Sequence, residues 1–251
     1  MATTPEKLPN RKTPASIYRW YLAAGLCGSM LAVTFALHPA RLVASSATPA
    51  PQSTAATQAH PRNTSRPYTG DLSIFDSPGR DERLQINRVM DMLGISTGKN
   101  VADIGAGSGW FTVRAAKRVT DTGTVYAVDI NPQATKYISE RAQREQLHNV
   151  KTILSKPDDP SLPPDSVDAV LLLKTYHEVA HPVVLLKQLR ASLKPDAKLG
   201  IIDRNGSADN HGIDKDVVIK EAQEAGYRLV TQSDLVKGDG MDYFMIFEQQ
   251  P

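Results

Sequence analysis

The chain has 251 residues, of which 41% are hydrophobic and 22% charged, so it can fold around one sizeable core and is neither collagen-like nor wholly disordered. Its formal net charge of +2 is unevenly spread, because residues 1–70 carry seven Lys or Arg against one acid, whereas residues 71–251 carry 22 Lys or Arg against 26 acids. The acidic balance of the larger part disfavours a nucleic-acid partner, and the single cysteine, Cys27, excludes an intramolecular disulfide and a thiolate zinc cluster.

The N-terminal part of the chain is predicted to direct it to a membrane. Residues 1–19 are polar and basic, and residues 20–37 form an uncharged, mostly apolar run of 18 residues. This length lies at the lower limit for a helix that spans a bilayer and just above that of a signal-peptide core, so a retained anchor and a cleaved signal remain open alternatives. Because the positive charges precede the run, the N-terminus is expected in the cytoplasm and the rest of the chain across the membrane.

Residues 38–67 are predicted to be a disordered linker. From residue 44 onward this segment is rich in Ala, Ser, Thr and Pro and has almost no large apolar side chain to bury. The globular domain is therefore expected to span residues 68–251.

Beyond Asp71, helical and strand patterns alternate, which is typical of a mostly parallel sheet covered on both faces. The expected helices are residues 81–93, 111–119, 132–146, 182–193 and 213–225. The expected strands are residues 100–104, 124–129, 150–154, 167–173, 198–203, 227–231 and 242–248. The last two strands follow each other with only a glycine-containing link between them, so the final strand is expected to be antiparallel. The prediction is an α/β, Rossmann-like, seven-stranded sheet.

A glycine-rich turn between the first expected strand and the next helix gives the sharpest functional signal. Residues 101–109 read VADIGAGSG, with glycines at 105, 107 and 109 that let the backbone turn tightly and approach a ligand. The spacing is G-x-G-x-G, and Asp103 stands two residues ahead of the first glycine. Dinucleotide-binding proteins carry G-x-G-x-x-G instead, so the turn disfavours a nicotinamide oxidoreductase.

This turn resembles motif I of the class I S-adenosylmethionine-dependent methyltransferases, and the resemblance extends from Phe75 to the C-terminus. It implies a Rossmann-like fold, S-adenosylmethionine as cofactor and methyl transfer as activity. It also implies cofactor contacts from the motif I residues Asp103, Gly105, Ala106, Gly107 and Gly109.

The same resemblance assigns three more cofactor-binding residues. Asp129 ends the second expected strand, where the family's acid binds both ribose hydroxyls, although an acid that caps the following helix is the alternative. Ile130 follows, where the family offers an apolar face to the adenine. Lys156 replaces the acid usual after the third strand, so the adenine contact is assigned to Asp158, with a solvent-facing turn as the alternative. Residues 193–197 (LKPDA) resemble the family's L-K-P-G-G turn with both glycines replaced.

The acceptor side is expected in residues 174–178 (KTYHE), the loop that follows the fourth expected strand at the carboxyl end of the sheet. His177 is the candidate base for an oxygen or nitrogen nucleophile, and Glu178 is expected to orient it. Tyr176 is a third catalytic candidate in the same loop. The alternative is that His177 only caps the helix that begins near residue 182.

Upstream, residues 75–81 (FDSPGRD) resemble a segment found in a subset of bacterial methyltransferases, many of them apparently membrane-targeted. Tyr68 and Arg80 are expected to close over the cofactor, Arg80 by pairing with its carboxylate, whereas a helix-capping turn is equally compatible with this segment. No H-x-x-E-H, G-x-S-x-G or Walker motif is present, so no metal site is expected, and the remaining histidines, His211 among them, are interpreted as surface residues.

Taken together, these features predict a methyltransferase of a small-molecule acceptor that is attached to a membrane or exported across it. The alternative is a non-catalytic, cofactor-binding or regulatory module at the membrane. That alternative arises because the methyl donor is made in the cytoplasm, whereas the charge rule places the domain on the other side.

Overall fold

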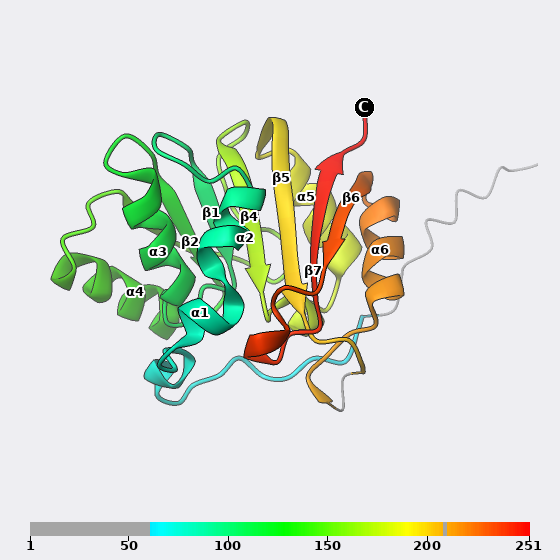
Figure 1. Ribbon diagram of the computed structural model, residues 1–251, viewed down its shortest axis with the longest axis horizontal. Coiled ribbons are helices and arrows are strands. Elements are labelled where there is room, and N and C mark those ends of the chain that lie inside the picture. The colour runs from blue at the N-terminus through cyan, green and yellow to red at the C-terminus, as the bar shows by residue number, and fades with distance from the viewer. Residues whose placement is uncertain (1–60, 208–209) are drawn as a thin grey trace, which may run out of the picture. The chain divides into compact units, whose positions relative to one another are not determined.

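A computed structural model describes residues 61–207 and 210–251, which form a seven-stranded sheet with helices on both faces (Figure 1). The strands are β1 (Val101–Ile104), β2 (Val125–Asp129), β3 (Val150–Leu154), β4 (Val167–Leu173), β5 (Leu193–Asp203), β6 (Tyr227–Ser233) and β7 (Tyr243–Gln249). The helices are α1 (Arg80–Leu84), α2 (Ile86–Met92), α3 (Trp110–Val119), α4 (Pro132–Arg144), α5 (Pro182–Arg190) and α6 (Lys215–Glu224). Short 3₁₀ helices are η1 (Leu72–Phe75), η2 (Tyr176–Glu178) and η4 (Lys237–Asp239).

The strand order is β3-β2-β1-β4-β5-β7-β6. All neighbouring pairs are parallel except those of β7, which runs antiparallel to both β5 and β6. The predicted Rossmann-like sheet with an antiparallel last strand is therefore confirmed.

The two central strands determine where a ligand can bind. All four residues of β1 are buried, and β4 is the apolar run VDAVLLL, as expected for strands that are covered on both faces. From β1 the chain proceeds toward β2 and β3 on one side, and from β4 toward β5 on the other. Ligands of such sheets bind beyond the carboxyl ends of the strands at this switch point.

Alternate residues of each strand face opposite layers, and each layer has its own core. Val101 and Leu171 pack with side chains of α2 and α3 on one face. Ala102 and Val170 pack with side chains of α5 and α6 on the other face. The two layers hold the carboxyl ends of β1 and β4 side by side.

Three predicted elements differ most from the structure, namely two helices and the strand predicted over residues 198–203. The helix predicted over residues 81–93 is divided into α1 and α2 at Gln85, whose φ of 51° is left-handed and interrupts the helix. The helix predicted to reach residue 193 ends at Arg190, and β5 already begins at Leu193, which pairs with Val167 ahead of a register shift. Asp196 has a φ of 64° at the position where the family's turn carries glycine.

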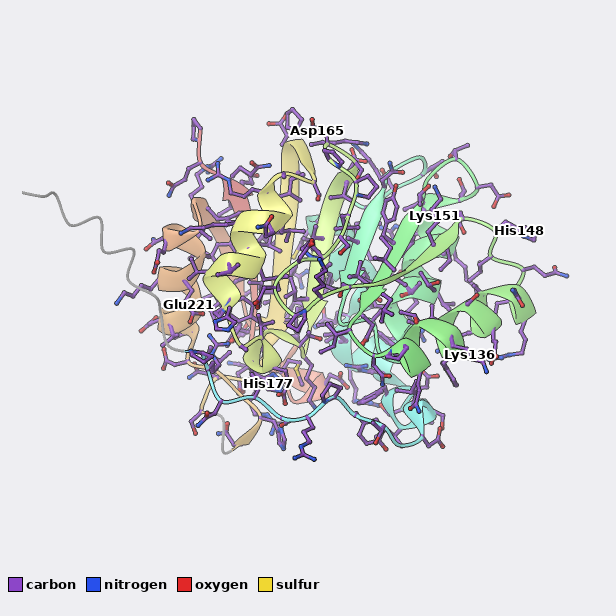
Figure 2. All side chains as sticks on the ribbon, turned by 180° about the vertical axis from the view of Figure 1, so that it is seen from behind. Lys136, His148, Lys151, Asp165, His177 and Glu221 are labelled. Carbon is purple, nitrogen blue, oxygen red and sulfur yellow. The ribbon has the colours of Figure 1, made fainter. Side chains whose placement is uncertain are left out.

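An N-terminal strap, residues 61–76, runs along the carboxyl edge of the sheet and appears in cyan in both views (Figures 1 and 2). At its start, Nη2 of Arg62 donates to both carboxylate oxygens of Glu221 of α6 at 2.7 Å, and Nη1 donates to the backbone carbonyl of Tyr176. At its end, Asp76 accepts from Ser108 and from Arg141 of α4. The strap thus connects the two sides of the sheet across the switch point.

The first residues of this strap fall within the predicted linker. Residues 61–67 have no helix or strand, but their contacts with the domain begin at Arg62 instead of Tyr68. The predicted segments 1–19 and 20–37, and the linker up to residue 60, lie outside the described residues. Within the described part of the chain, none of the helices combines the length and apolar character that a membrane crossing requires.

Candidate functional site

The glycine turn joins β1 to α3 at the carboxyl edge of the sheet. Gly105, Gly107 and Gly109 have φ values of 73°, 56° and 74°, a region that side chains other than glycine rarely adopt. A Cβ atom on Gly105 would lie 2.3 Å from the side chain of Thr175, and one on Gly109 would lie 3.1 Å from Ile138. At Gly107 the nearest atom would be the ring of Phe75, at 3.6 Å. The turn therefore packs tightly at both ends and faces the strap in its middle.

Asp129, the last residue of β2, is held against this turn by backbone donors. Its Oδ2 accepts from the amide of Gly107 at 2.9 Å and its Oδ1 from the amide of Asn131 at 2.8 Å. Burial raises the pKa of this carboxyl, although the two amides oppose the shift. Each oxygen keeps capacity for one more hydrogen bond. Ile130 follows with 44% of its surface exposed.

Asp103 lies deeper, in β1 beneath the turn. It is 2% exposed, and its Oδ2 accepts from the hydroxyl of Thr112 in α3 at 2.6 Å. Burial raises the pKa of Asp103 from its ordinary value of 3.8 to about 7, which the bond from Thr112 opposes and the negative charge of Asp129 favours. Near neutral pH this acid is therefore poised between its neutral and charged forms.

The Asp103→Asn variant is expected to be more stable than the wild-type protein above neutral pH. Because the folded pKa exceeds the unfolded one, the stabilisation by protonated Asp103 is complete below 3.8 and is lost as pH rises through about 7. Between about pH 5 and pH 8 this single group lowers the free energy of unfolding by roughly 2 to 3 kcal/mol. Asparagine does not titrate, so the variant lacks this dependence of the free energy of unfolding on pH, and its side-chain oxygen can still accept the hydrogen bond from Thr112.

Urea unfolding of both proteins at these two pH values checks the prediction. The exposed Asp121 offers a matched Asp→Asn control that should leave the pH dependence unchanged. An equal loss of stability with pH in wild type and Asp103→Asn would contradict it.

Asp158, in the loop after β3, carries the unsatisfied acceptor of the site. Its Oδ1 is the single buried side-chain nitrogen or oxygen without a hydrogen-bond partner that is found among residues 61–207 and 210–251. Lys156 is exposed, and its backbone pairs with that of Asp159 to close a small turn. In this loop a carboxylate oxygen is therefore buried without a partner, whereas the lysine faces solvent.

The acceptor loop, residues 174–178, follows β4 and touches the glycine turn through Thr175. Two residues further on is His177, which is 7% exposed and is labelled in Figure 2. Its Nδ1 lies 2.9 Å from both carboxylate oxygens of Asp203, the last residue of β5. Asp203 is fully buried and also accepts from the amide of His177. Because a carboxylate only accepts, the proton of the neutral ring resides on Nδ1 and the lone pair on Nε2.

Glu178 and Tyr176 have different surroundings in this loop. Glu178 Oε1 lies 3.4 Å from Nε2 of His177, and its Oε2 accepts from the amide of Ser65 in the strap at 2.6 Å. Tyr176 is fully buried, and its hydroxyl donates to Glu221. Burial raises the pKa of Tyr176 well above its ordinary value, and the charge of Glu221 adds to the shift. This environment suits a structural role for Tyr176 better than a catalytic one.

Comparisons with known proteins agree with this geometry. A family model described as a methyltransferase domain matches residues 102–201. Among solved structures, a SAM-dependent methyltransferase from Aquifex aeolicus aligns with a TM-score of 0.65 at 26% identity, covering 71% of this chain and 98% of that one. Residues 102–201 are therefore identified as a methyltransferase domain, and the fold around them is that of the class I S-adenosylmethionine-dependent methyltransferases. The cofactor of this domain is S-adenosylmethionine.

Curated relatives of this methyltransferase domain share a shorter region. The protein-L-isoaspartate O-methyltransferase of Pyrococcus horikoshii is 27% identical over 111 residues, which are 44% of this chain and 47% of that protein. The demethylmenaquinone methyltransferase of Listeria welshimeri is 25% identical over 114 residues, 45% of this chain and 48% of that protein. The chain thus spans about half the length of these relatives.

The residues at the carboxyl edge of the methyltransferase domain fit its cofactor. The two free acceptor positions of Asp129 match the two hydroxyls of a ribose. The partnerless Oδ1 of Asp158 is an acceptor for an amino group such as that of adenine, and exposed Ile130 offers apolar surface to a base. The backbone at Gly107, where a Cβ would meet only the Phe75 ring, leaves room for a close approach.

Arg80, predicted to bind the cofactor carboxylate, has other partners here. Its guanidinium lies 2.7 Å from Asp239 of η4, donates to the carbonyl of Phe75 and stacks over Trp110 at 4.6 Å. Gly79 caps α1, and Asp81 lies in its first turn, as the helix-capping alternative predicts. A cofactor contact from Arg80 stays a prediction.

Sequence reasoning missed two residues of this site. Asp203 ends a predicted strand, so the rule that parallel strands end at one edge was sufficient to place it near His177. His211 lies in the loop after β5, with its Nδ1 3.7 Å from Oε1 of Glu178 and 67% of its side chain exposed. Its surface position agrees with the sequence interpretation, but its proximity to His177 had no signal in the sequence.

Proposed function

We propose that this protein transfers the methyl group of S-adenosylmethionine to an oxygen or nitrogen atom of a small-molecule acceptor. One observation carries the proposal: the loop that holds His177 is in contact with the cofactor turn. The side chain of Thr175 fills the space beside Gly105, and its hydroxyl lies 3.4 Å from the carbonyl of Gly105. An acceptor bound beside His177 would therefore be adjacent to the cofactor.

In this mechanism the residues of the chain orient the two reactants and remove one proton. S-adenosylmethionine supplies a methyl group on a sulfonium centre, which is already a good leaving group. The nucleophilic atom forms a bond to the methyl carbon, the carbon–sulfur electron pair remains on sulfur, and Nε2 of His177 takes the proton of the nucleophile. Asp203 keeps His177 in the tautomer with a free Nε2 lone pair, and alignment in a dry site supplies the remaining acceleration.

The test uses the full-length protein in two steps. Calorimetric titrations with S-adenosylmethionine and S-adenosylhomocysteine measure binding, for which we expect micromolar dissociation constants. A screen of small hydroxyl and amine compounds with methyl-labelled donor then measures transfer. Binding with label transfer supports the proposal, binding without transfer to any acceptor favours the non-catalytic module, and absence of binding overturns both.

We also propose that residues 20–37 attach the protein to a membrane. The support is the uncharged run of 18 residues preceded by basic residues. Membrane fractionation of the full-length protein and of a variant without residues 20–37, each with a C-terminal reporter active on one side of the membrane only, tests attachment and side together. Equal partition of the two proteins would contradict the proposal.

A further inference from the structure

Three potential metal ligands converge at the acceptor loop. Nε2 of His177 and Nδ1 of His211 lie 3.4 and 3.7 Å from the same oxygen, Oε1 of Glu178, and the three ligand atoms all lie within 4.8 Å of one another. In the described part of the chain this is the single group of three or more His, Cys, Asp or Glu side chains with such an arrangement. Figure 2 shows His177 at the carboxyl edge, beside the strap.

These separations match the edges of a coordination tetrahedron. Nitrogen and oxygen ligands bind Zn²⁺ at about 2.0 to 2.2 Å, so neighbouring ligands of a tetrahedral ion are about 3.3 to 3.6 Å apart. The two distances to Glu178 Oε1 already agree with this range or exceed it only slightly. The two histidine nitrogens lie within 4.8 Å of each other, and a small movement of His211, whose side chain is 67% exposed, can bring them to this spacing.

The surrounding hydrogen bonds leave one free acceptor atom on His177 and one on Glu178, each available to bind a cation. The Nδ1 proton of His177 is bound by the fully buried Asp203, which leaves the Nε2 lone pair pointing at Glu178. Histidine ligands of metals commonly donate their other N–H to a carboxylate in this way. On Glu178, the amide of Ser65 occupies Oε2 and leaves Oε1 free. Among the described residues, the ion-pair partners of Glu178 are the two histidines, with no Lys or Arg.

We propose that His177, Glu178 and His211 bind one divalent transition-metal ion, of which Zn²⁺ is the representative. Two imidazole nitrogens and one carboxylate oxygen suit zinc and its neighbours in the first transition series, whereas Mg²⁺ and Ca²⁺ prefer all-oxygen sites. Three protein ligands leave the fourth position open, as in catalytic rather than structural zinc sites.

The consequence for substrate choice rests on the proposed function. An ion in the open site would hold an oxygen of the acceptor beside the cofactor and lower the pKa of that oxygen, so the ion would replace His177 Nε2 as the group that makes the nucleophile reactive. Acceptors with a hydroxyl next to a second oxygen, which chelate a divalent ion, would then be preferred over isolated hydroxyls.

The decisive experiment titrates full-length, chelator-treated protein with Co²⁺ and follows the visible absorption of the tetrahedral ion, with Zn²⁺ as competitor. We expect one equivalent to bind with histidine-type absorption and to be displaced by Zn²⁺. His211→Ala should weaken binding at least roughly 100-fold, because losing a ligand costs more than the 10- to 100-fold typical of an outer partner. His211 is exposed and outside the core, so this variant is expected to keep its fold, which circular dichroism verifies.

Two matched variants separate this proposal from that of methyl transfer. His148→Gln, on an exposed residue far from His177 in Figure 2, should bind Co²⁺ as the wild type does. Asp129→Ala should keep Co²⁺ binding and lose the cofactor, whereas His211→Ala should lose Co²⁺ and keep the cofactor. Failure of cofactor binding alone leaves the metal site supported. Absence of Co²⁺ uptake, equal uptake by His211→Ala, or an equal loss in His148→Gln would overturn it.

Discussion

Replacement of Asp129 by alanine is expected to weaken S-adenosylmethionine binding roughly 100-fold or more. The bound cofactor would lose two charge-assisted hydrogen bonds from its ribose hydroxyls to the carboxylate, each worth about 1.5 to 3 kcal/mol. Each 1.4 kcal/mol corresponds to a factor of ten in affinity. The variant also frees the amides of Gly107 and Asn131, which now bind Asp129 at 2.9 and 2.8 Å and thereby shape the turn. Calorimetry on the full-length protein measures the change in dissociation constant.

Two further variants serve as a control and as a test of the second proposed cofactor contact. Asp121→Ala removes an exposed acid from the turn after α3 and should leave the affinity within twofold of wild type. Asp158→Ala removes the partnerless Oδ1 and should cost roughly tenfold, the value of one hydrogen bond. Wild-type affinity in Asp129→Ala would contradict the assignment of this carboxylate to the ribose of the cofactor.

Replacement of Asp203 by asparagine is expected to lower kcat roughly 100-fold while the KM for S-adenosylmethionine stays unchanged. An asparagine amide facing Nδ1 of His177 would donate to it, so the ring proton would move to Nε2 and the free lone pair on the acceptor side would be lost. Removing a positioned proton acceptor typically costs a factor of 10² to 10⁴. Asp203 touches neither Asp129 nor Asp158, so cofactor affinity should not change.

The ring of His177 reports this effect before any acceptor is known. Nitrogen-15 chemical shifts of the chelator-treated protein should assign the proton to Nδ1 in wild type and to Nε2 in Asp203→Asn. The variant should keep wild-type affinity for the cofactor, which shows that its fold is intact. An unchanged tautomer, or an unchanged kcat once an acceptor is found, would refute the positioning role of Asp203.

The sheet and the cofactor side of the site could be predicted because their signals are local. The strand of residues 167–173 is an uninterrupted apolar run, and the glycines at 105, 107 and 109 carry their conformational requirement in the sequence itself. Asp129 follows from its place at the end of the strand next to that turn. Because the ligand lies at the common end of neighbouring strands, the predicted cofactor-binding residues depend little on the exact register between those strands.

The partners of the acceptor loop could not be predicted in the same way. His177 meets Asp203 because β4 and β5 pair in parallel, and it meets His211 because the next loop folds back over the same edge. No periodicity within one element encodes such contacts. Composition was equally uninformative for the first strap residues, since Arg62 lies in a Pro- and Ser-rich context yet forms an ion pair with Glu221.

The strap also limits the distance between the acceptor loop and the residues proposed to bind the ribose. On the acceptor side, the backbone amide of Ser65 donates to Glu178. On the ribose side, the carbonyl of Tyr68 accepts from the side-chain amide of Asn131, and the backbone amide of Asn131 donates to Asp129. The four residues from Ser65 to Tyr68 reach at most about 13 to 14 Å when fully extended, so this short piece of chain limits how far the two half-sites can separate. One residue more or less between Ser65 and Tyr68 changes that limit by about 3.5 Å, a length comparable to the gap between reacting atoms. The length of this segment is thus as much a part of the site as the side chains it connects.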